Sequence, residues 1–183
     1  MKRLIAAGLS LGMACGAAAE GNVKTKTPAS PLNIAAVVRF TPPAGWTPVE
    51  YANGVDPVLR FEKLSDAVQI RVFGARGSDY PTPKDFLAGP AATEEGAAPA
   101  PDGTVTVAGK KLALYRRRFS TGVSNPHGPA SPKAPMGVER FCVLPLKDGR
   151  FAVLAYRRST PAPDLEGKGE KAWAAFLKTV KPR

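Results

Sequence analysis

The residues of this chain that could do chemistry as a group are its basic side chains. Five arginines lie in two segments with strand-like patterns: Arg116, Arg117 and Arg118 in one, and Arg157 and Arg158 at the end of the other. Alternation along a strand places Arg116 and Arg118 on one side of a sheet and Arg117 on the other. If Arg117 and Arg157 lie on neighbouring strands, their like charges require an anion or an acidic side chain between them. These arginines therefore predict a binding surface for an anionic or protein partner.

A second interpretation of the same arginines is protection of a sheet edge, because charged side chains on an edge strand prevent pairing with another chain. The whole chain carries 26 Lys and Arg against 15 Asp and Glu, a formal net charge of +11. Such a charge favours encounters with anionic lipids, glycans or proteins. Its alternative explanation is that it keeps the protein soluble and serves no binding. No nucleic-acid-binding motif accompanies the charge, so we expect no nucleic-acid partner.

Residue types that serve as nucleophiles, bases or metal ligands are few and dispersed. His127 is the single histidine, so a triad or a multi-histidine metal site would depend on this one ring. Cys142 lies in an apolar run and is interpreted as a small buried hydrophobe. Glu94, Glu95 and Asp102 occur in an Ala- and Pro-rich loop, which holds no defined separation between carboxylates. We predict no catalytic residue, metal site or cofactor, with an enzyme of unrecognised, hydrolase-like type as the alternative.

Alternating hydrophobicity predicts β-strands along most of the chain. The strongest hairpin signal is Asp148-Gly149, between the segments 138–146 and 151–157. Segment 151–157 is apolar on both faces, which predicts a central strand covered on two sides. The other predicted strands are 35–40, 58–64, 68–73, 104–107 and 112–119.

Two helices complete the predicted fold. Thr82 and Pro83 begin a short helix, and Asp164 caps a C-terminal helix that runs to about Thr179. From Trp173 onward, large apolar residues of the C-terminal helix fall at positions i, i+3, i+4 and i+7, so one stripe faces a core. We therefore expect an α+β fold, in which an antiparallel sheet is packed by a C-terminal amphipathic helix and a short second helix.

The first 19 residues have the composition of an export signal. Two basic residues precede the apolar run 4–13, and the small residues 17–19 suit a signal peptidase. The apolar run is too short to cross a bilayer as a helix, and no membrane-spanning run follows it. We therefore expect residues 1–19 to be a signal peptide, and the mature protein, beginning at Glu20, to be periplasmic or secreted.

Cys15 offers an alternative outcome of processing, as the lipid-modified first residue of an envelope lipoprotein. Gly12 stands three residues before it, where such sites usually carry Leu. Residues 20–33 are rich in Lys, Thr, Pro and Ser and predict a flexible tether. Residues 34–183 then form a single domain. Cleavage after residue 19 would leave one cysteine, so we expect no intramolecular disulfide.

The ordered part of the chain resembles the Mog1/PsbP-like fold. The resemblance rests on residues 40–46, where a strand is followed by Pro-x-Gly-Trp, on residues 105–110, and on the last strand pair with the helix at 173–180. It implies an α-β-α sandwich found in small exported bacterial proteins, whose members act as non-catalytic assembly factors or binding modules. We therefore expect a non-catalytic binding or assembly module of the bacterial envelope, which contacts its partner through a basic sheet face and an exposed loop at 120–135.

Overall fold

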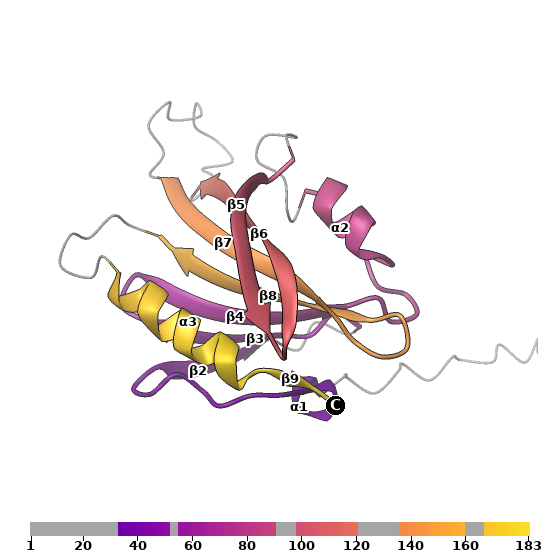
Figure 1. Cartoon of the computed structure of the whole chain (residues 1–183), viewed down its shortest axis with the longest axis horizontal. Helices are drawn as coiled ribbons and strands as arrows, with labels where there is room; N and C mark the ends of the chain where they lie inside the picture. The colour runs from indigo at the N-terminus through magenta and orange to yellow at the C-terminus, as the bar shows by residue number, and fades with distance from the viewer. Residues whose placement is uncertain (1–32, 52–54, 91–97, 121–135, 160–166) are drawn as a thin grey trace, which may run out of the picture.

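A large antiparallel sheet with helices on both faces organises the fold (Figure 1). The computed structural model describes residues 33–51, 55–90, 98–120, 136–159 and 167–183. In chain order the elements are α1 (Ile34–Val37), β1 (Val38–Arg39), β2 (Thr47–Tyr51), β3 (Val58–Lys63), β4 (Asp66–Phe73), α2 (Pro83–Ala88), β5 (Ala100–Val107), β6 (Lys110–Ser120), β7 (Met136–Pro145), β8 (Phe151–Arg158), α3 (Lys168–Thr179) and β9 (Lys181–Pro182). The predicted α+β class, with its antiparallel sheet and C-terminal helix, is confirmed.

Seven strands form one sheet in the order β2-β3-β4-β8-β7-β6-β5. Strand β8 occupies the middle position, as the apolar character of both its faces predicts. The hairpin between β7 and β8 turns at Asp148 and Gly149, which have φ angles of 60° and 74°. These positive angles suit the Asp-Gly pair, because glycine and, to a lesser degree, aspartate tolerate the left-handed region. Two more hairpins form, β3–β4, which turns at Leu64 and Ser65, and β5–β6.

The N-terminal part of the described chain differs from the prediction. Residues 35–40 were expected to form a strand, but the Asn33 side chain caps a short helix, α1, by accepting a hydrogen bond from the Ala35 amide at 2.8 Å. Only Val38 and Arg39 are extended, and they pair with β9 at the C-terminus. Local alternation could not reveal this, because the partner strand lies more than 140 residues away in the sequence.

The two predicted helices both form, with one difference at a cap. Helix α2 begins at a capping box in which Thr82 and Asp85 bond to each other's backbone amides, and Pro83 occupies its first turn. Helix α3 begins later than expected, with Gly167 rather than Asp164 at its N-cap. Asp164 lies outside the described residues, as do the predicted signal peptide with Cys15, nearly all of the tether and of the 120–135 loop, His127, Glu94 and Glu95.

Two apolar clusters cover the two faces of the sheet. The larger one lies under α3, which contributes Trp173, Phe176 and Leu177 from the predicted stripe. The smaller one lies under α2, where Phe86 is fully buried among aromatic side chains of β4, β7 and β8. We call these sides of the sheet the α3 face and the α2 face. No helix in the described part of the chain is long and apolar enough to cross a membrane.

Candidate functional site

Three neighbouring strands bring Arg117 and Arg157 to either side of one acidic residue. In the sheet register, Arg117 of β6 lies opposite Glu139 of β7, and Glu139 lies opposite Arg157 of β8. The acidic side chain expected between these two arginines is therefore Glu139. Arg157 pairs with Ala67 of β4 on one side and with Glu139 of β7 on the other, so edge protection does not explain its charge. Arg117 pairs with β7 alone, because the pairing of β5 with β6 ends at Arg116, and edge protection therefore stays an alternative for this part of β6.

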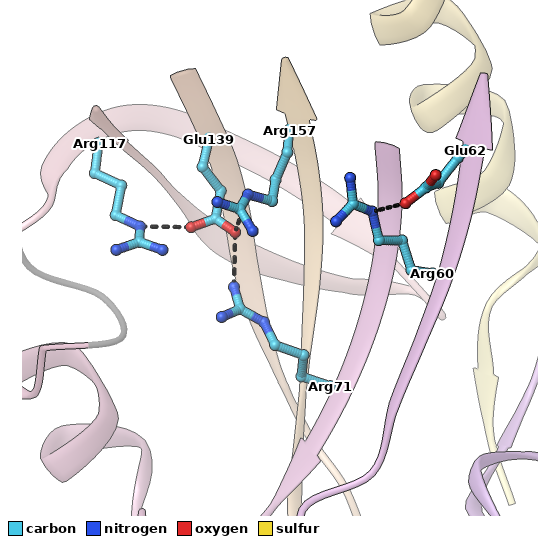
Figure 2. A network of polar contacts seen from close by, with 6 residues as sticks. All are labelled: Arg60, Glu62, Arg71, Arg117, Glu139 and Arg157. Atoms are coloured by element: carbon cyan, nitrogen blue, oxygen red, sulfur yellow. Dashed lines mark hydrogen bonds and ion pairs between the residues drawn. The ribbon is translucent and has the colours of Figure 1, made fainter. Parts of the chain in front are cut away.

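The Glu139 side chain is fully buried and lies in contact with three guanidinium groups (Figure 2). Its Oε2 accepts a hydrogen bond from Arg117 Nε at 2.5 Å, and its Oε1 accepts one from Arg71 Nη2 at 2.8 Å. Arg157 Nε lies 3.8 Å from the same Oε1. A buried carboxylate needs such partners, because an isolated charge in the interior is strongly disfavoured. Glu139 therefore orients three cations on the α2 face.

A further arginine, Arg60 of β3, extends this group beyond Arg157. Its Nε lies 2.6 Å from a carboxylate oxygen of Glu62 on the same strand. We call Arg60, Arg71, Arg117, Arg157 and Glu139 the arginine cluster. Its residues come from five neighbouring strands, β3, β4, β8, β7 and β6.

Aromatic rings of the α2 face hold two of the guanidinium groups. The Cζ atom of Arg157 lies 3.9 Å from the ring centre of Phe119, and that of Arg71 lies 5.7 Å from the ring centre of Phe86. Such stacking favours arginine over lysine, since the planar guanidinium matches the ring face. Arg71 and Arg157 are thus positioned both by Glu139 and by aromatic contacts.

The environment of Arg157 disfavours the charged form of its guanidinium group. Burial lowers the pKa of this guanidinium, Glu139 opposes that effect, and the nearby cations Arg71, Arg117 and Arg60 lower the pKa further. Burial and the neighbouring cations together thus outweigh the effect of Glu139 on the pKa of Arg157. An additional negative charge near Arg157 would stabilise the cluster.

The other three arginines of the predicted surface lie on the opposite side of the sheet. Arg116 pairs in register with Arg140, and Arg118 and Arg158 both pair with Val138. These positions alternate with the cluster, and they share the α3 face with the buried Tyr156. The arginines are therefore divided as strand alternation predicts, with Arg117 and Arg157 on the α2 face and Arg116, Arg118 and Arg158 on the α3 face.

Sequence reasoning missed the residues that complete the cluster. Arg71 and Glu139 are 68 positions apart, and nothing local to either shows that they meet. The available signal was Glu139 itself, a lone acidic residue in a strand whose neighbours Phe141 and Cys142 are apolar. Such a residue in a strand predicted to be buried calls for a cationic partner.

A second polar site lies under the start of α3. The Tyr156 hydroxyl donates a hydrogen bond of 3.0 Å to Oδ1 of Asp66, which is almost fully buried. Burial raises the pKa of Asp66, although this hydrogen bond and the charge of Arg158 act in the opposite direction. Asp66 also lines a cavity of about 220 Å³, together with Ala44, Trp46, Lys63, Lys168, Gly169 and Ala172.

The remaining candidates for chemistry have structural roles where they are described. Cys142 is fully buried, and burial raises the pKa of its thiol to about 12, as suits an unreactive core residue. Asp102 lies in β5 rather than in a loop, and its carboxylate accepts a hydrogen bond from Arg140 at 2.6 Å. Within the described ranges, no three His, Cys, Asp or Glu residues are placed to hold a metal ion.

Comparison with known proteins assigns no family to the chain. No protein-family model matches it, and no curated protein matches it in sequence. The Mog1/PsbP-like resemblance therefore stays a prediction, and the case for function depends on the arginine cluster and on the Asp66 cavity.

Proposed function

We propose that this chain is an exported, non-catalytic binding or assembly module of the bacterial envelope, related to the Mog1/PsbP-like proteins. Its α2 face contacts an anionic or protein partner through the arginine cluster, together with the segment 120–135. The observation that supports this proposal is the sharing of one buried carboxylate, Glu139, by Arg71, Arg117 and Arg157. Three positive charges against one negative charge leave a formal charge of +2.

The burial of these side chains separates the cluster from ordinary surface charge. The side chains of Arg117, Arg71 and Arg157 are 10%, 12% and 26% exposed. Solubility is served by exposed charges, whereas charges withdrawn from water are costly unless they are paired. Retaining a net positive charge in this place is better explained by recognition of an anion.

A retention experiment tests the proposal. The mature protein is immobilised, and the amount of envelope extract that it retains is compared for the native sequence and the variants Arg71→Gln and Arg157→Gln. Arg116→Gln serves as the matched control, because it removes the same charge from an exposed position on the other face. We expect retention to fall for the first two variants and to stay unchanged for the control. Equal retention by all four proteins would remove the proposal.

Export and anchoring are tested separately. Intact-mass measurement of the protein isolated from the envelope distinguishes a chain that begins at Glu20 from one that begins at an acylated Cys15. The first result supports a periplasmic or secreted module, and the second supports the lipid-anchored alternative. An uncut chain found in the cytosol would contradict both.

The cavity beside Asp66 favours a second candidate, an enzyme of hydrolase-like type. A buried carboxyl group with a raised pKa can hold a proton and act as a general acid. Lys63 and Lys168 line the same cavity. Chromogenic ester, glycoside and phosphate-ester substrates test this candidate, with Asp66→Asn as the variant. An equal rate for the native and variant proteins would exclude Asp66 as an acid catalyst.

A further inference from the structure

We infer that the arginine cluster recognises a phosphate group, and specifically a dianionic phosphate monoester. This inference rests on the proposed function, because it names the chemistry of the partner that the α2 face contacts. Three features of the cluster carry it, namely its unsatisfied donors, its prior ordering and its charge.

The first feature is a pair of buried N–H donors. Within the described part of the arginine cluster, three buried Nε atoms make no hydrogen bond, those of Arg60, Arg71 and Arg157. The Nε atom of Arg60 has an ion-pair partner in Glu62 at 2.6 Å, which leaves the pair on Arg71 and Arg157. A buried donor without an acceptor is costly, and an absent ligand is one explanation for such a group. An oxyanion bound beside the two side chains would supply acceptors to these Nε–H groups.

The second feature is the ordering of the guanidinium groups before any ligand arrives. Glu139 holds Arg71 through a hydrogen bond of 2.8 Å, and the ring of Phe119 supports Arg157 at 3.9 Å. Arg71 and Arg157 also lie on the adjacent strands β4 and β8. Side chains fixed in this way lose little conformational freedom on binding, which is a main cost of recognition by arginine.

The third feature is the formal charge of Glu139 and the three arginines that share it. Arg71, Arg117 and Arg157 against Glu139 give +2, while Arg60 and Glu62 form a neutral pair. A phosphate monoester has a second pKa near 6 and carries close to two negative charges at neutral pH. A phosphodiester or a single carboxylate carries only one. The monoester also has three terminal oxygens in a tetrahedral arrangement. These oxygens can accept hydrogen bonds from guanidinium groups that lie on separate strands.

Binding experiments on the mature protein test the inference with two sources of the same group. Inorganic phosphate is titrated by calorimetry, and vesicles of phosphatidylcholine containing phosphatidic acid are used for co-sedimentation. Vesicles containing phosphatidylglycerol serve as the comparison, because its phosphodiester headgroup carries one negative charge where phosphatidic acid carries close to two. We expect phosphatidic acid to be bound at least about tenfold more tightly than phosphatidylglycerol, since each lost charged hydrogen bond weakens binding by about that factor.

Conservative variants separate the inference from the broader proposal. Arg71→Lys and Arg157→Lys keep the positive charge but remove the guanidinium fork, and Arg116→Lys is the matched control on the α3 face. We expect the first two to weaken phosphate binding about tenfold or more, and the control to bind as the native protein does. Thermal unfolding of each variant shows that the fold is retained.

The outcomes distinguish the phosphate inference from the proposed binding function. Binding of phosphatidic acid without binding of inorganic phosphate supports the inference and identifies a lipid headgroup as the source; the reverse identifies a free phosphate compound. If neither probe binds while Arg157→Gln still reduces retention of the envelope extract, the phosphate inference is overturned and the proposed function stands. If Arg157→Gln leaves retention unchanged and neither probe binds, both fail.

Discussion

The backbone of Gly169 at the start of α3 lies against the hydroxyl group of Tyr156 on β8, with no room for a side chain between them. A methyl group at position 169 would place its carbon 2.6 Å from the Tyr156 oxygen and would also collide with the carboxyl group of Asp66. The Asp66–Tyr156 hydrogen bond and the close approach of α3 to the sheet therefore depend on each other.

Replacing Gly169 with Ala should lower the free energy of unfolding, although Ala is normally the better helix former. Insertion of one methyl group into a packed site costs about 1–3 kcal/mol. Chemical denaturation followed by circular dichroism measures the change. Lys168→Ala, at the neighbouring exposed position, should stay within about 0.5 kcal/mol of the native protein. Unchanged stability of Gly169→Ala would show that α3 does not dock as the structure describes.

Replacing Glu139 with Gln should be one of the most destabilising single changes in the sheet. Removing the carboxylate leaves three guanidinium groups close together in a largely buried place, and loss of one partner of a buried ion pair costs about 3–5 kcal/mol. The change is measured by urea denaturation. Glu62→Gln provides the control, because its more exposed ion pair with Arg60 is worth less than about 1 kcal/mol.

The Glu139→Gln variant should also respond to phosphate more strongly than the control does. An added anion can take over part of the role of the lost carboxylate, so phosphate should raise the melting temperature of Glu139→Gln more than that of Glu62→Gln. Comparing the two variants at one phosphate concentration removes the general stabilisation that phosphate salts give to proteins. Equal increases would mean that the cluster has no particular affinity for the anion.

The stability contributed at Asp66 should fall as the pH rises. The pKa of this carboxyl group is raised above its ordinary value of 3.8, mainly by burial. Between 3.8 and the raised value, the folded protein holds a proton that the unfolded chain has released, so stability declines through this window and stays lower above it.

Asp66→Asn isolates this effect, because the amide keeps a polar side chain that does not ionise. The difference in unfolding free energy between the native protein and Asp66→Asn should therefore move against the native protein as the pH rises above 3.8. Asp148→Asn, at a turn position where the side chain is 80% exposed, controls for loss of a carboxylate in general. A difference that does not vary with pH would contradict the burial of Asp66.

The thiol of Cys142 should be unreactive in the native protein. Its pKa is raised from 9.0 to about 12, which lowers the thiolate population at neutral pH about a thousandfold, and its side chain is fully buried. In a shortened chain that begins at residue 20, and so lacks Cys15, a thiol reagent should therefore react only as fast as the sheet opens. Ala174→Cys, at an exposed position of α3, should react at once. Rapid labelling of Cys142 without denaturant would contradict this.

Local patterns in the sequence determined most of the secondary structure. The Asp148-Gly149 pair predicted the hairpin of β7 and β8, and the apolar character of both faces of 151–157 predicted the central position of β8. The spacing from Trp173 to Val180 predicted the buried stripe of α3. These features follow from hydrophobic period and turn chemistry, which act between residues a few positions apart.

Tertiary structure alone decided which charged residues meet. Alternation separated Arg117 from Arg116 and Arg118 in advance, but only the strand order placed Arg71 and Glu139 together, 68 positions apart in the chain. The same holds for α1 and β1, whose conformation depends on pairing with β9, and for Gly169 beneath α3. Contacts of this kind arise from strand order and register, which are selected by the packing of the whole sheet rather than by any local segment.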